Sequence, residues 1–85
     1  MELVYQARKV LEDFLKQPSP AVDRKEVVAY ATLEAFTSHF PLQACKRDRE
    51  LIKQCQSIMR VERDRFYKQR RIALSKLAEL HNRQL

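Results

Sequence analysis

The chain has 85 residues, a length that suits one small domain, and it contains no Gly, three Pro and two Cys. The absence of Gly excludes Gly-rich phosphate-binding loops and dinucleotide-binding motifs, which need Gly where the backbone approaches a phosphate. The net charge of +6 is uneven: residues 1–43 carry five Lys or Arg against six acids, whereas residues 44–85 carry twelve against five. The basic C-terminal half therefore indicates an acidic protein or a nucleic acid as a partner, or a charge that serves solubility alone.

The two cysteines and the apolar runs indicate the cellular compartment of the protein. No apolar stretch approaches the roughly 20 residues that cross a membrane, and no secretory signal begins the chain. On one helix Cys45 and Cys55 would lie about 15 Å apart, too far to form a disulfide. Free thiols are typical of a reducing compartment, so we expect an intracellular protein of the cytoplasm or nucleus, without a membrane partner.

The first helix is expected over about residues 2–16. Its apolar residues recur at steps of four, three and four and so share one face: Leu3, Ala7, Val10 and Phe14. The linker over 17–20 follows, where Pro18 stops the helix because Pro restricts the residue before it. The face is broad, which predicts packing against other helices.

The second helix is expected over about residues 21–39, with its regular part starting near Asp23. Asp23 and Glu26 have the spacing of a capping box, in which each side chain accepts a hydrogen bond from a free backbone N–H. Most of the following positions are apolar around the whole circumference of the helix. Such a helix is expected at the centre of the fold, in contact with two or more neighbours.

The third helix is expected to be a single rod over about residues 42–83, because no Gly or Pro interrupts it and Pro41 suits a first turn. One apolar stripe recurs every seven residues along it: Ile52, Met59, Phe66, Ala73 and Leu80. A helix of that length reaches over about 60 Å, more than twice the length of the second helix. Its outer half would then have no neighbour within the chain.

The expected fold is therefore all-α: two short helices in a hairpin-like unit, followed by one long basic helix of about 40 residues. A three-helix, coiled-coil-like bundle would form within this single domain over 1–85, completed by a second copy or another protein. The expected partner-binding residues are the apolar ones that lack an internal neighbour: Met59, Phe66, Ile72, Ala73, Leu77 and Leu80.

Catalytic chemistry is not expected. His39 and His81 are the only histidines, and the histidines and cysteines do not have the spacing of a zinc site. Glu62 and Asp64, two residues apart, would point to different sides of a helix and could not work as an acid–base pair. We therefore expect no enzyme activity, no metal, no cofactor and no small-molecule substrate.

The favoured function is a non-catalytic assembly module, a scaffold or adaptor of an intracellular complex, that homodimerises or docks on another helical subunit. The contact would use the stripe of the long helix together with the apolar face of the first two helices. The alternative is RNA or DNA binding by a basic face that also carries an aromatic ring. Its contact residues would be Arg60, Arg63, Tyr67, Arg70 and Arg71, since Lys and Arg neutralise phosphates and Tyr can stack on a base.

Overall fold

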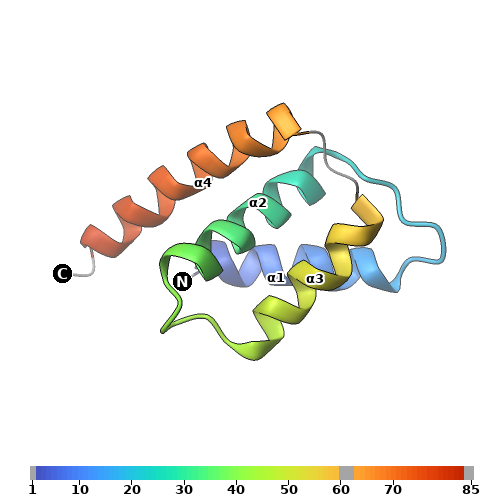
Figure 1. Ribbon diagram of the computed structural model, residues 1–85, viewed down its shortest axis with the longest axis horizontal. Coiled ribbons are helices and arrows are strands. Elements are labelled where there is room, and N and C mark those ends of the chain that lie inside the picture. The colour runs from blue at the N-terminus through green and yellow to red at the C-terminus, as the bar shows by residue number, and fades with distance from the viewer. Residues whose placement is uncertain (1, 60–62, 84–85) are drawn as a thin grey trace.

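The computed structural model describes residues 2–59 and 63–83, and of residues 63–65 only the backbone. It holds four helices (Figure 1): α1 over Glu2–Lys16, α2 over Arg24–His39, α3 over Lys46–Met59 and α4 over Arg63–Arg83. No strand occurs in the described part of the chain. The all-α class expected from the sequence is thus confirmed.

The apolar face of α1 packs against the rest of the molecule. The buried positions recur at steps of three, four and three, as one face of a helix requires: Val4, Ala7, Leu11 and Phe14. Leu3, Val10 and Leu15 flank this face and are partly buried. The expected face was correct in extent, but its centre lies at Val4 and Leu11 rather than at Leu3 and Val10.

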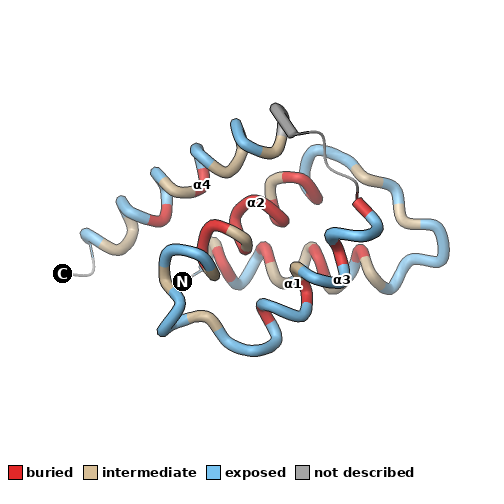
Figure 2. The backbone as a smooth tube through the Cα atoms, in the orientation of Figure 1, coloured by how far each residue is buried: buried red, intermediate tan, exposed pale blue. Residues whose placement is uncertain are grey.

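Helix α2 lies at the centre of the fold. It packs against each of the other three helices, and Figure 2 shows that it is the helix with the most buried positions. Burial on several sides explains why α2 has almost no polar face. Its buried residues are Glu26, Val27, Ala29, Tyr30, Ala31, Thr32, Leu33, Ala35 and Phe36.

The single long helix expected over 42–83 is wrong. The helix ends at Met59, and the chain turns back so that α4 lies beside α2 and runs in the same direction (Figure 1). The Tyr30 and Phe66 rings lie 5.4 Å apart, and Glu34 forms an ion pair with Arg70. The longest dimension of the molecule is 42 Å, less than a continuous helix of that length would need.

Burial explains why the chain turns back without a Gly or Pro. Leu77 is fully buried, Ala73 is nearly so, and Phe66 packs against the core. Burying a Leu or Phe side chain stabilises by about 1.5–3 kcal/mol, whereas a backbone hydrogen bond contributes a net ~1 kcal/mol. Covering the outer half of the stripe therefore outweighs the cost of ending α3 at Met59 and beginning a separate helix at Arg63. The expectation that a partner must complete the bundle is wrong for the same reason.

A turn over residues 40–45 joins α2 to α3, so Pro41 does not begin a helix. The backbone N–H groups of Gln43 and Ala44 both donate to the carbonyl of Phe40. The Arg49 guanidinium donates to the carbonyls of Pro41 at 3.1 Å and Ala44 at 3.2 Å. These bonds hold the turn in one conformation and satisfy carbonyls that no helix would satisfy.

Asp48 joins the start of α3 to α1. Its side chain is fully buried and accepts two hydrogen bonds from Arg8, with Nη2–Oδ2 at 2.9 Å, and a third from the Cys45 backbone N–H at 3.1 Å. Burial raises the pKa of Asp48, but the hydrogen bonds from Arg8 and Cys45 outweigh it, so the pKa lies below its ordinary value. The ionised carboxylate thus caps α3 and fixes it to α1.

The capping box expected at Asp23 and Glu26 does not form. Asp23 is the N-cap residue of α2, but its side chain makes no capping hydrogen bond. The Glu26 side chain is buried instead, and its Oε2 atom accepts no hydrogen bond in the described part of the chain. Because Glu26 lies on the side of α2 that the other helices cover, the side chain is enclosed rather than turned back to the N-cap.

Glu26→Met is expected to raise the free energy of unfolding by about 1–2 kcal/mol, since a buried polar atom without a partner is destabilising. Urea denaturation followed by circular dichroism measures the change. Glu34→Met is the matched control, because Glu34 is on the same helix but bonds to Arg70. The control should be destabilised, and a loss of stability in Glu26→Met would contradict the expectation.

The two thiols are expected to differ in reactivity. Burial raises the pKa of Cys55 to about 11, whereas Cys45 is exposed in the turn before α3. Since the thiolate is the reactive form, Ellman's reagent at pH 8 should titrate one thiol rapidly in the native protein and the second only after unfolding. Cys45→Ser should remove the rapid phase. Two rapid thiols in the native protein would show that Cys55 is accessible.

Candidate interaction groove between α1 and α2

The apolar residues expected to bind a partner lie mainly inside the molecule. Met59, Ala73 and Leu77 are buried in the core. Phe66 and Leu80 are partly buried, with Phe66 packed against the core cluster. Ile72 is 39% exposed and is the one member of the set that faces solvent. These six residues therefore do not form a continuous binding surface on this fold.

Of the five residues expected to contact a nucleic acid, the structure describes three with their side chains. Arg60 lies outside the described residues, and so does the side chain of Arg63. Arg70 bonds to Glu34 and lies 3.3 Å from His39 Nε2, facing α2. Arg71 and Tyr67 are exposed on α4. Because Arg70 is neutralised by its partner, the cationic face is weaker than the sequence indicates.

The two histidines have different neighbours in the structure. His39 lies near Arg70, whereas the His81 ring packs on Phe40 with centroids 5.7 Å apart. No group of three metal-ligating side chains occurs within residues 2–59 and 63–83.

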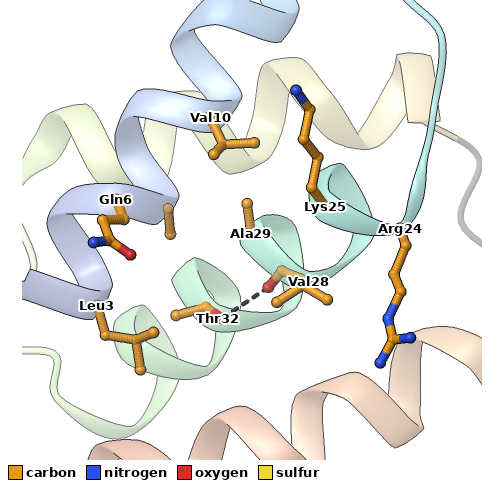
Figure 3. Close-up of a pocket in the computed structure, with 9 residues that line it drawn as sticks. Leu3, Gln6, Val10, Arg24, Lys25, Val28, Ala29 and Thr32 are labelled. Atoms are coloured by element: carbon orange, nitrogen blue, oxygen red, sulfur yellow. Dashed lines mark hydrogen bonds between the residues drawn. The ribbon is translucent and has the colours of Figure 1, made fainter.

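A groove of about 480 Å³ lies between α1 and α2 and opens to solvent (Figure 3). We call it the α1–α2 groove. The lining is mainly apolar and comes from these two helices alone. The lining residues are Leu3, Gln6, Ala7, Val10, Arg24, Lys25, Val28, Ala29 and Thr32.

Small residues form the floor of the groove and larger ones its walls. Ala7 and Ala29 are buried, since α1 and α2 approach closely where neither helix carries a long side chain. Leu3, Val10 and Val28 are only partly buried, so their apolar surface remains available. The sequence held a signal for this site: the apolar faces of both helices are broader than their mutual packing requires.

The polar groups at the Leu3 end of the groove are satisfied internally. The Thr32 hydroxyl donates to the carbonyl of Val28 at 2.7 Å (Figure 3), and the Gln6 amide donates to Glu2 at 3.3 Å. Arg24 and Lys25 differ: they are exposed, and neither forms a hydrogen bond or ion pair within the described part of the chain. An occupant therefore meets an apolar surface with unpaired positive charge at one end.

None of the residues that line the groove has a carboxyl, imidazole or thiol group, and its Thr32 hydroxyl already bonds to the Val28 carbonyl. Its volume lies within the range of about 300–1,000 Å³ that is common for ligand sites. The arrangement is suited to binding.

Comparison with known proteins gives no further guide. No protein-family model matches the chain. No curated protein and no solved structure matches it either. None of the helices over the described residues combines the length and apolar character needed to cross a bilayer.

Proposed function

We propose that the chain is a non-catalytic protein-interaction module that binds a helical segment of another protein in the α1–α2 groove. One observation carries the proposal: apolar side chains from two helices line a common open hollow in the groove, while most of the stripe described in the C-terminal half is covered internally. Open apolar surface of this kind is characteristic of protein-binding sites.

The dimensions of the groove support a helix as the occupant. Leu3 to Val10 covers about 10 Å of α1, which equals about two turns of a docked helix. Such a helix would place apolar anchors at i, i+3, i+4 and i+7 against Leu3, Val10 and Val28. A second copy of the chain is less suited, because a two-fold contact would set one hollow against another and leave a gap between them.

The test uses a fluorescein-labelled, 18-residue amphipathic peptide with Leu at i, i+3, i+4 and i+7, followed by fluorescence anisotropy. Val28→Glu is expected to weaken peptide binding at least tenfold, because it places a charge on the apolar wall. Ile58→Glu is the matched control: Ile58 is 44% exposed on α3, away from the groove, and its substitution should leave the affinity unchanged.

Two further measurements separate the alternatives. A labelled oligonucleotide that binds at low salt while the peptide does not would favour the nucleic-acid function over the proposed one. Light scattering that shows a stable dimer disrupted by Val28→Glu would assign the groove to a second copy instead. Equal peptide affinities of Val28→Glu and the unaltered protein would contradict the proposed groove.

A further inference from the structure

The two ends of the α1–α2 groove differ in charge, and this difference indicates how a partner lies in it. Leu3, Gln6 and Thr32 form one end, which is neutral. Arg24 and Lys25 line the other part of the groove, and in Figure 3 their side chains point in opposite directions, Lys25 past Val10 and Arg24 away from it. On the basis of the proposed function, we infer that the partner helix carries acidic side chains at one end only and lies with that end beside Arg24 and Lys25.

Arg24 and Lys25 stand between two acids in the chain, Asp23 and Glu26. Neither cation forms an ion pair within the described residues, although four ion pairs occur elsewhere in that part of the chain. Arg24 also begins α2, where the backbone N–H groups of the first turn carry partial positive charge. The two cations that line the groove and the helix terminus have the same sign, although Asp23 and Glu26 lie in the same turn. A carboxylate of the partner would complement the two cations and the terminus.

The apolar wall alone cannot fix the direction of the occupant. A helix with apolar anchors at i, i+3, i+4 and i+7 presents a similar stripe when it is reversed, so Leu3, Val10 and Val28 would accept either orientation. Charge at one end removes this ambiguity, since charge complementarity sets register and suppresses wrong partners. The apolar walls thus supply affinity, and Arg24 and Lys25 supply direction.

The first experiment compares two peptides with the same Leu anchors, one with two Glu and one with two Lys in its last turn. The Glu peptide should bind about three- to tenfold more tightly, the change expected of two exposed ion pairs, and the preference should fade in 1 M salt. The double variant Arg24→Glu with Lys25→Glu should reverse the preference. Lys9→Glu with Lys16→Glu is a charge-matched control at two exposed positions of α1 and should preserve the preference for the Glu peptide.

The second experiment measures direction. A nitroxide on the Glu-bearing end of the peptide should broaden the amide resonances of Val10 and Lys25 and spare those of Leu3 and Thr32. Equal broadening at both ends would overturn the inferred direction.

The outcomes separate this inference from the function on which it rests. If both peptides bind equally and Val28→Glu weakens the binding of both, the groove binds helices but the inference of an acidic end on the partner helix is wrong. If neither peptide binds, the groove and the inference both fail.

Discussion

Replacing Leu77 with Ala is expected to lower the free energy of unfolding by about 2–5 kcal/mol, the cost of removing a buried Leu and leaving a cavity. Leu77 is fully buried where α4 packs on α2. A small domain has a total stability of only about 5–15 kcal/mol, so the variant should be close to unfolding. Urea denaturation followed by circular dichroism measures the loss.

Ile72→Ala is the matched control on the same helix. Ile72 is 39% exposed, so its truncation should cost less than about 1 kcal/mol. On a straight helix that projects from the fold, both side chains would face solvent and both substitutions would have small effects. Equal small losses in the two variants would therefore contradict the packing of α4 on α2.

Replacing Arg8 with Met is expected to destabilise the protein by about 3–5 kcal/mol, because it leaves the buried Asp48 carboxylate without its charged partner. The cost should exceed that of Arg47→Met, since Arg47 and Glu50 form an exposed pair with 3.9 Å between the charged atoms. Chemical denaturation of both variants at pH 7 measures the difference.

Asp48→Asn in the Arg8→Met background should recover part of the loss, because Asn removes the buried charge and still accepts from the Cys45 N–H. Acidification gives a second readout. The pKa of Asp48 is lower in the folded state than its unfolded value of about 3.9, so its contribution is present above about pH 4 and is lost as the pH falls through the folded pKa. If Asp48→Asn recovers none of the stability lost in Arg8→Met, the effect of Arg8→Met reflects lost packing alone.

Local patterns in the sequence predicted the first half of the fold. The periodicity of α1 and the apolar circumference of α2 follow from their own residues, and the structure places α2 in contact with three neighbours. The hydrophobic stripe of the C-terminal half was also identified correctly as apolar surface that must be covered.

Local signals could not show that the outer half of this stripe lies back against α2. Residues 42–83 favour helix throughout, and the turn back depends on burial against α2, which is a property of the whole molecule. The groove was missed for a related reason. The broad apolar faces of the first two helices are visible in the sequence, but which of their residues, such as Val10 and Val28, stay open as a groove depends on how α1 and α2 pack.

The position of α4 at one side of the fold determines which part of the molecule opens most easily. Helix α4 rests chiefly on one neighbour, α2, whereas α1, α2 and α3 all pack against one another. The amide hydrogens of α4 should therefore exchange with solvent through a partial opening that requires less free energy than global unfolding. The three N-terminal helices form the protected unit, and the α1–α2 groove belongs to it.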